Sequence, residues 1–151
     1  MKVLGMMLCF LIAFNCSGQT SENIRMSKRH GVVLTGAGPG LYGSISYDYF
    51  ISPKIDIEIG AGPLTLFGGV RYHFEGDEDK NWTPYVGGYG IYIWIFEIFD
   101  DDDNEAPLAF YMPIGLQYIG KNGFSFAAEF AGMYGVGEFI EWGGIKLGYR
   151  F

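Results

Sequence analysis

Cysteine is scarce in this chain and confined to its beginning. The only two cysteines among 151 residues, Cys9 and Cys16, both stand within the first sixteen positions. A zinc site built from cysteines, or a disulfide framework, is therefore excluded for everything that follows.

Basic residues are also few, and they are dispersed. Lys and Arg number 10 against 17 Asp and Glu, which gives a formal net charge of −7. Proteins that bind nucleic acid cluster Lys and Arg to replace the counterions around phosphates. The composition therefore argues against nucleic acid as a partner.

No apolar run has the roughly twenty residues that a membrane-spanning helix needs. The apolar segment 3–14 is shorter, follows Lys2 and precedes the small-residue segment 16–18. A positive residue, a short apolar core and small residues are the pattern of a secretory signal peptide. We therefore expect residues 1–18 to be cleaved on export.

Two other interpretations of the N-terminal segment 1–18 are less favoured. A membrane anchor is disfavoured by the length of the apolar segment. A lipoprotein acylated at Cys16 is disfavoured because Phe14 and Asn15 fit poorly where small residues are expected.

Helical periodicity is absent after a polar segment at 19–29, which we expect to be flexible. Apolar residues instead alternate with period two, between clusters of Gly, Pro, Asn and Asp, which is typical of strands. The pattern predicts eight strands, at residues 30–38, 42–51, 54–62, 66–74, 83–94, 108–120, 124–135 and 142–151.

The predicted strands are long. Most have nine to thirteen residues, more than the usual five or six of soluble proteins and close to the nine to eleven of a tilted transmembrane strand. Tight turns are expected at 52–53 and 121–123, and a longer acidic connection at 75–82. The other connections would form the opposite rim, at 39–41, 63–64, 95–107 and 137–141.

One face of the predicted strands is bulky and apolar. The last strand carries Ile145, Leu147 and Tyr149 on one face and Lys146 and Arg150 on the other. Bulky residues suit the lipid-facing outer wall of a closed barrel, whereas small and charged residues suit a narrow interior. Interfacial aromatic girdles are predicted from Tyr42, Tyr47, Tyr72, Tyr118, Tyr149, Trp82, Trp94 and Trp142. A secreted soluble barrel that binds a small apolar ligand is the alternative.

The same alternation predicts that the face opposite the apolar one, which lines the interior, is charged. The residues expected to point inward are Asp48, Asp56, Glu58, Arg71, His73, Gln117, Glu129, Lys146 and Arg150. Four acids and three bases suggest ion pairs across the lumen, because an unpaired buried charge is costly. Eight strands leave an interior that side chains fill, so we expect no open pore.

The signal peptide, the alternating strands and the C-terminal segment 146–151 resemble small Gram-negative outer-membrane β-barrel proteins of the OmpA/OmpX type. The most specific element is the terminal Phe151 with Tyr149 two residues before it. The resemblance, over residues 30–151, implies an all-β, eight-stranded antiparallel up-and-down transmembrane barrel in the outer membrane. It also implies a bilayer with lipopolysaccharide as surroundings, and contact of Tyr149 and Phe151 with the barrel-assembly machinery during insertion. No cofactor is implied.

An enzymatic role is weighed because some barrels of this size are lipid A deacylases with a His/Ser pair. The only histidines are His30 and His73, and the segment 71–75 around His73 lacks the His-x-Ser-Asn pattern of those enzymes. We therefore expect a non-enzymatic protein with a structural or surface-interaction role, and a lipid A-modifying enzyme remains an alternative.

The longest predicted connection, 95–107, is acidic. Its carboxylates, Asp100, Asp101, Asp102, Asp103 and Glu105, lack the spacing of an EF-hand loop. We expect a solvated acidic surface loop without a metal site, and an extracellular partner, if there is one, to bind here. Bridging by Ca²⁺ or Mg²⁺ is the alternative.

Overall fold

The structure of the chain is a computed structural model, which describes residues 23–78, 80–94, 108–135 and 138–151. The signal peptide predicted at 1–18 and the acidic connection predicted at 95–107 lie outside the described residues. The described elements are a short helix, a 3-10 turn and eight strands: α2 (Ile24–Ser27), β1 (His30–Ala37), η1 (Gly38–Gly40), β2 (Gly43–Ser52), β3 (Ile55–Ala61), β4 (Thr65–His73), β5 (Trp82–Ile93), β6 (Leu108–Ile119), β7 (Phe124–Gly135) and β8 (Glu138–Arg150).

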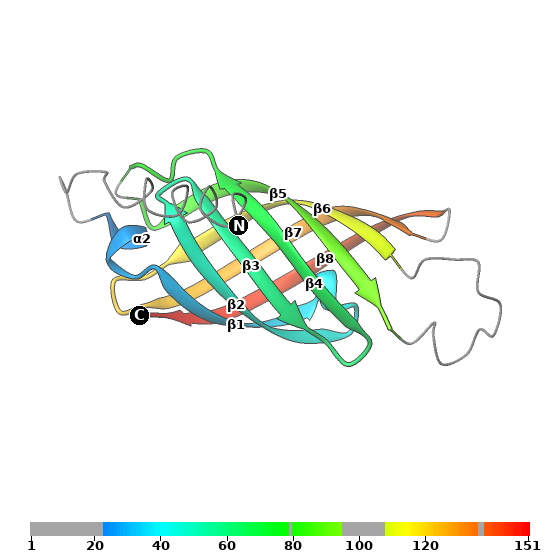
Figure 1. The fold of residues 1–151 in the computed structure, drawn as a ribbon. Coiled ribbons are helices and arrows are strands. Elements are labelled where there is room, and N and C mark those ends of the chain that lie inside the picture. Colours follow the sequence, from blue (N-terminus) through cyan, green and yellow to red (C-terminus); the bar gives the residue numbers. More distant parts are fainter. Residues whose placement is uncertain (1–22, 79, 95–107, 136–137) are drawn as a thin grey trace, which may run out of the picture.

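The eight strands form a closed antiparallel barrel in which each strand pairs with its neighbours in the sequence. The barrel closes between β1 and β8, where Gly31 lies opposite Arg150 and Ala37 lies opposite Gly144 (Figure 1). Closure gives strands a hydrogen-bonding neighbour on both sides and leaves no edge around the ring. The predicted all-β, eight-stranded up-and-down fold is therefore confirmed.

The alternation of the sequence becomes an alternation of burial. In β3, Ile57 and Ile59 are exposed on the outer wall, whereas Asp56 and Glu58 are buried inside. The same arrangement, with the apolar residue outside and the charged residue inside, is found in β8, where Leu147 is exposed and Lys146 is buried. The wall is thus apolar outside and charged inside, the reverse of a soluble barrel.

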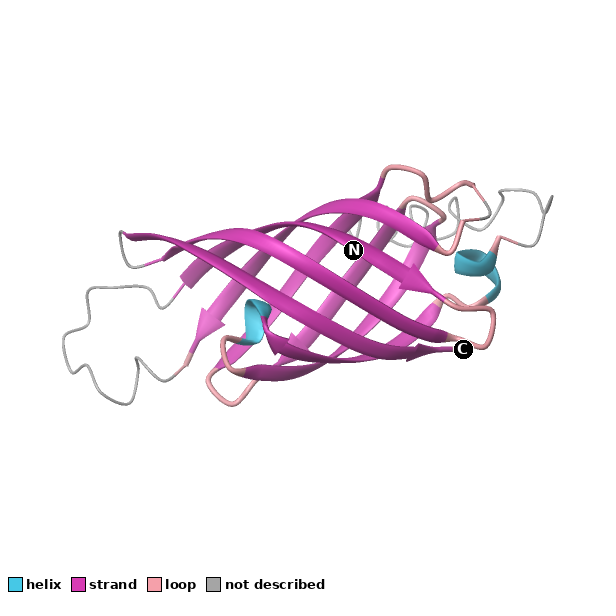
Figure 2. Ribbon diagram, turned by 180° about the vertical axis from the view of Figure 1, so that it is seen from behind, coloured by secondary structure: helices cyan, strands magenta, loops and turns pink. Residues whose placement is uncertain are grey.

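The two ends of the barrel differ, as the two views show (Figures 1 and 2). The end that carries α2, the C-terminus and the β2–β3, β4–β5 and β6–β7 turns is called the termini end. At the opposite end, called the far end, η1 is buried in the mouth, and the Trp142 indole N–H donates to the Gly38 carbonyl at 3.0 Å. Trp142 also packs against the interior apolar cluster. It is therefore part of the mouth rather than of an exposed girdle, which corrects the prediction for this residue.

The last strand begins earlier than predicted. The segment 137–141 was expected to be a connection, but β8 starts at Glu138, and Phe139 and Ile140 pair with Tyr134 and Met133 of β7. Cross-strand contacts between large apolar residues stabilise the ladder and outweigh the local loop signal. The other strand ends differ from the predictions by at most one residue.

The segment 19–29 was expected to be flexible, yet its described part, residues 23–29, packs onto the termini end. Ile24 is buried against Phe50 and Ile119. The Asn23 side chain donates to the Gly76 carbonyl at 2.8 Å. Tertiary contacts of this kind leave no periodic signal in a segment so short.

Across the described ranges, no helix combines the length and the apolar character needed to cross a membrane.

Candidate functional site

The predicted charged residues gather inside the barrel. We call this set the charged belt; its members are Asp48, Asp56, Glu58, Arg71, His73, Glu129, Lys146 and Arg150, and each is at most 8% exposed. The belt meets apolar side chains on both sides. The Arg150 guanidinium lies 4.2 Å from the centre of the Phe50 ring, and Glu58 accepts a hydrogen bond from Tyr89 of the far-end apolar cluster.

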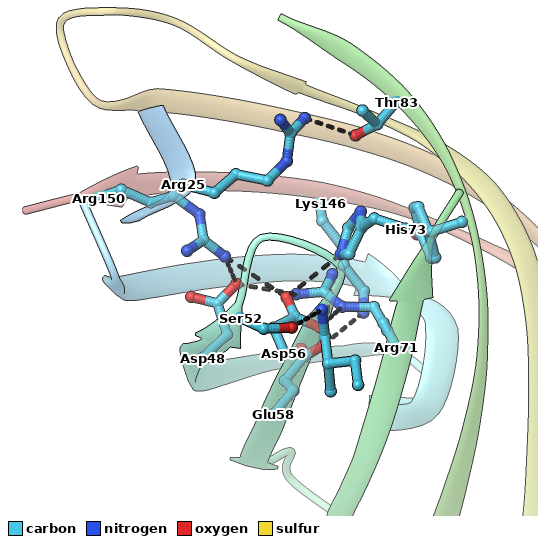
Figure 3. A network of polar contacts seen from close by, with 12 residues as sticks. Arg25, Asp48, Ser52, Asp56, Glu58, Arg71, His73, Thr83, Lys146 and Arg150 are labelled. Carbon is cyan, nitrogen blue, oxygen red and sulfur yellow. Dashed lines mark hydrogen bonds and ion pairs between the residues drawn. The ribbon is translucent and has the colours of Figure 1, made fainter. Parts of the chain in front are cut away.

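Arg71 is the centre of the belt (Figure 3). Its Nε and Nη2 donate to the two oxygens of Asp56 at 3.0 and 2.6 Å. Nη2 also donates to Asp48 Oδ2 at 2.8 Å, and Nη1 lies 3.6 Å from Glu58 Oε2. One planar guanidinium therefore contacts three carboxylates from β2 and β3, a task suited to the rigid five-donor fork of arginine.

Asp48 joins two cations from strands on different sides of the barrel. Its Oδ2 accepts hydrogen bonds from Arg71 of β4 and from Arg150 of β8. Arg150 Nη2 also lies 3.6 Å from Asp56. These ion pairs cross the lumen and tie the closing strand β8 to the β2–β4 wall.

Lys146 forms a second group within the belt. Its Nζ donates to Glu58 Oε2 at 2.8 Å and lies 3.4 Å from Glu129 Oε2. Glu129 in turn accepts hydrogen bonds from the hydroxyls of Tyr85 and Tyr111, at 2.6 and 2.9 Å. The two glutamates are thus held by a shared ammonium and by tyrosine hydroxyls.

Glycines make room for the aromatic rings that reach the belt. Three inward-facing glycines each lie opposite an aromatic residue in the strand register: Gly60 opposite Phe67, Gly69 opposite Tyr89 and Gly115 opposite Tyr85. A Cβ placed on Gly69 would meet the Tyr89 ring at 2.4 Å. These glycines therefore let the Tyr89 and Tyr85 rings lie against the backbone, from which their hydroxyls reach Glu58 and Glu129.

His73 lies inside the belt and not at the lipid surface. Its Nε2 is 3.6 Å from Asp56 Oδ2, and its ring is tilted against those of Phe50 and Tyr85. Gln117, also expected to point inward, is 3% exposed. His30, by contrast, is on the outer wall, where its ring stacks on that of Phe151.

Arg25 is a buried cation that the sequence analysis did not find. It is fully buried at the termini end, where its Nη2 donates to Thr83 Oγ1 at 2.7 Å and to the Lys80 carbonyl at 3.2 Å. Figure 3 shows its guanidinium above the belt, pointing toward Thr83. Among the described residues, the buried Asp and Glu number four, and Arg25 raises the buried Lys and Arg to the same number.

Bulky residues inside the barrel are a second feature that was missed. The interior was expected to be small and charged, yet Tyr89, Ile91, Tyr111 and Met133 fill the far part of the lumen together with Phe67, Ile93, Ala109 and Ala131. β5 contributes Tyr89, Ile91 and Ile93 to this cluster, and its outer face carries Gly88 and Gly90 instead of bulky residues. The rule that bulky residues face lipid fails for this strand.

Outside the barrel some charged side chains form ion pairs that are exposed to solvent. At the termini end Lys54 and Asp77 form an exposed ion pair at 3.0 Å, and this hydrogen bond lowers the pKa of the Asp77 carboxyl. Exposed pairs of this kind contribute little to stability. The described residues contain no group of three or more His, Cys, Asp or Glu arranged to hold a metal ion.

Comparison with known proteins gives one informative match. The N-terminal β-barrel domain of OprF from Pseudomonas aeruginosa superposes with a TM-score of 0.57, covering 82% of this chain and 98% of that domain at 16% identity. This chain has the fold of that domain. No protein-family model matches the sequence, and the search of curated proteins finds no match.

The other predicted residues of this OprF-like barrel fall in two places. Tyr149 and Phe151 lie on the outer wall at the termini end, 55% and 59% exposed. Phe151 exchanges two backbone hydrogen bonds with His30 and so extends the β1–β8 closure to the last residue. The predicted acidic residues 100–105 lie outside the described part of the chain.

Proposed function

We propose that the chain is a non-enzymatic integral outer-membrane β-barrel with a structural or surface-interaction role and no open pore. The observation that carries this proposal is the inverted polarity of the wall. Ile59 and Leu34 are 67% and 61% exposed on the outside, whereas Asp56 and Arg71 are at most 1% exposed on the inside. Hydrocarbon is the surrounding in which such a wall is stable.

The closed lumen is supported by what fills it. Side chains of the charged belt bridge the lumen between β4 and β8 through Asp48, and η1 is buried in the far mouth. Planar-bilayer recording of the purified protein tests this part of the proposal. We expect no stable single-channel currents, and large steady currents would refute the closed lumen.

Membrane integration is tested by extraction and gel migration. The protein should stay in the membrane fraction in alkaline carbonate and leave it only with detergent. The detergent-solubilised barrel should also migrate differently before and after boiling, because a closed barrel resists unfolding by dodecyl sulfate at room temperature. Release by carbonate without detergent would favour the secreted, ligand-binding alternative, against which the filled interior already argues.

The lipid A-modifying alternative has weaker support. His73 faces Asp56 inside the wall, whereas acyl chains would contact the outside of the barrel. Mass spectrometry of lipid A incubated with the purified protein should show unchanged acyl chains. A shortening that His73→Ala abolishes would establish the enzyme instead.

The partners follow from the same proposal. The bilayer and its lipopolysaccharide would surround the apolar wall, and Tyr149 and Phe151 would contact the barrel-assembly machinery during insertion. An extracellular partner would bind through the acidic residues of the segment 95–107.

A further inference from the structure

The described chain has five Lys and Arg residues outside the barrel interior, and all five lie at the termini end. Lys54 and Lys80 form ion pairs with carboxylates of the β4–β5 turn, at 2.8 to 3.0 Å. The other three are Lys28, Arg29 and Lys121, and no ion pair within the described ranges includes any of them. We call these three residues the basic arc.

The members of the basic arc lie on the two sides of the end of β8. Lys28 and Arg29 directly precede β1, and Lys121 lies in the β6–β7 turn. The backbone at the end of β8 bonds to β1 on one side and to this turn on the other, where the Arg150 N–H donates to the Gly123 carbonyl at 2.7 Å. Neighbouring strands are about 4.8 Å apart, so the two parts of the arc are separated by roughly 10 Å. Long Lys and Arg side chains from both sides can therefore approach one anion.

The acidic residues at this end lie on another part of the rim. Among the described residues they are Glu75, Asp77 and Glu78 of the β4–β5 turn. Both views show this turn on the side of the barrel away from the C-terminus, beside which the β6–β7 turn lies (Figures 1 and 2). A carboxylate at Phe151 would lower the charge of the basic arc by one and leave it positive. The charges of the rim are therefore segregated, and the basic arc attracts anions.

The basic arc borders the apolar wall. Phe124 and Tyr149 lie opposite each other in the β7–β8 register, and both rings are exposed on the outside. Aromatic rings at the end of an apolar wall mark the level of the lipid headgroups. Lys121 lies three residues before Phe124, and its apolar stem can extend along the wall while the ammonium group stays in water. The basic arc is thus at the height of the headgroups.

We propose that the basic arc binds the phosphate of an anionic phospholipid. The ammonium groups of Lys28 and Lys121 and the guanidinium of Arg29 would surround the phosphate, and the acyl chains would lie along Phe124 and Tyr149. Basic residues at a membrane surface attract anionic lipids in this way. The wall supplies contacts for acyl chains, which a free phosphate ion could not use. The inference rests on the proposed membrane integration, to which it adds the class of lipid.

The leaflet follows from the proposed orientation. Strand β5 ends and β6 begins at the far end, where Tyr92 lies opposite Leu108. The intervening segment 95–107 is proposed to meet an extracellular partner, so the termini end would face the periplasm. The outer membrane has lipopolysaccharide in its outer leaflet and phospholipids in its periplasmic leaflet. A phospholipid phosphate is therefore the anion that this end of the barrel would meet.

The test uses the purified protein in neutral detergent, with bound lipids counted by native mass spectrometry. Phosphatidylglycerol should bind more tightly than phosphatidylcholine. Lys28→Gln and Lys121→Gln should each weaken binding of phosphatidylglycerol by about fivefold, the effect of one basic residue near an anionic surface, and should leave binding of phosphatidylcholine unchanged. Lys54→Gln is the matched control: it removes the same charge from the acidic part of the rim and should keep the affinity for phosphatidylglycerol.

Equal binding of the two lipids, or equal loss of phosphatidylglycerol affinity in Lys121→Gln and Lys54→Gln, would overturn the proposal. Displacement of phosphatidylglycerol by millimolar inorganic phosphate would overturn it in favour of a site for soluble anions. Lipid A is titrated in parallel and should keep its affinity in Lys28→Gln and Lys121→Gln, whereas an equal loss would assign the basic arc to lipopolysaccharide instead. Carbonate extraction and heat-modifiable migration of each variant report separately on membrane integration, so failure of the inference is distinguishable from failure of the proposed function.

Discussion

Arg71 and Asp56 face each other across the β3–β4 ladder, and the guanidinium of one donates two hydrogen bonds, at 3.0 and 2.6 Å, to the carboxylate of the other. The strand register puts both side chains on the inner face of the barrel, because directly opposed residues of antiparallel strands share a face. The same guanidinium also contacts Asp48 and Glu58. Arg71 therefore compensates three buried acids at once.

Replacing Arg71 by Met should destabilise the barrel strongly. The substitution keeps an unbranched apolar stem but leaves Asp48, Asp56 and Glu58 without their shared cation. Removing one partner of a buried pair costs about 3–5 kcal/mol. The urea midpoint of the folded, heat-modifiable species in detergent should fall accordingly. Arg71→Lys should lose less, because it keeps the charge without the bidentate geometry.

Lys54→Met is the matched control for this prediction. It also removes a cation from an ion pair, but the Lys54–Asp77 pair is exposed at the termini end. Exposed pairs contribute little to stability, because water and salt screen them. Equal shifts of the urea midpoint for Arg71→Met and Lys54→Met would show that burial of the belt contributes nothing.

Glycines 69 and 88 should respond in opposite ways to a methyl group. An added Cβ at Gly69 meets the Tyr89 ring at 2.4 Å and the Gly88 carbonyl oxygen at 2.5 Å, whereas at Gly88 it meets nothing within 4 Å. Gly69→Ala should therefore cost about 1–3 kcal/mol through overpacking. Gly88→Ala should change stability by no more than about 0.5 kcal/mol. The free energies of unfolding in urea compare the two, and a milder effect of Gly69→Ala would contradict the packing of Tyr89 on this glycine.

The hydroxyls of Tyr85 and Tyr111 should be coupled through Glu129. Each donates to a different oxygen of the same carboxylate, and a hydrogen bond to a charged group contributes about 1.5–3 kcal/mol. Tyr85→Phe and Tyr111→Phe should each lower the free energy of unfolding, and the double variant should differ from their sum by more than about 0.5 kcal/mol. Strict additivity would indicate that the two hydroxyls act independently on Glu129.

Most of the fold and much of the belt could be predicted from the sequence, because both depend on period-two alternation. In β3 and in residues 145–150 of β8 each charged residue lies next to an Ile, Leu or Tyr, so a single alternation assigns Asp56, Glu58, Lys146 and Arg150 to the same face. In a closed meander that face is the interior for every strand. The period-two alternation therefore predicts both where the strands are and on which face of the sheet their charged residues lie.

The features that were missed depend on contacts distant in the sequence. Tyr89 points inward because Gly69 on the neighbouring strand has no side chain to oppose its ring. Arg25 is buried because the chain before β1 folds back to Thr83, 58 residues away. Neither contact changes the period-two pattern of the residues around it, so the sequence near Tyr89 or Arg25 could not predict it.

Arg25 should hold the segment before β1 against the termini end. Its guanidinium donates to the Thr83 hydroxyl and to the Lys80 carbonyl, while Ile24 beside it packs on Phe50. Arg25→Met keeps much of the side-chain volume but removes both hydrogen bonds, which should cost about 1.5–3 kcal/mol. Trypsin should then cleave the folded protein faster after Lys28 and Arg29, because α2 detaches more often. Met26→Ala, on the same turn but half-buried, should leave that cleavage rate nearly unchanged; equal acceleration in both variants would mean that Arg25 does not anchor the segment.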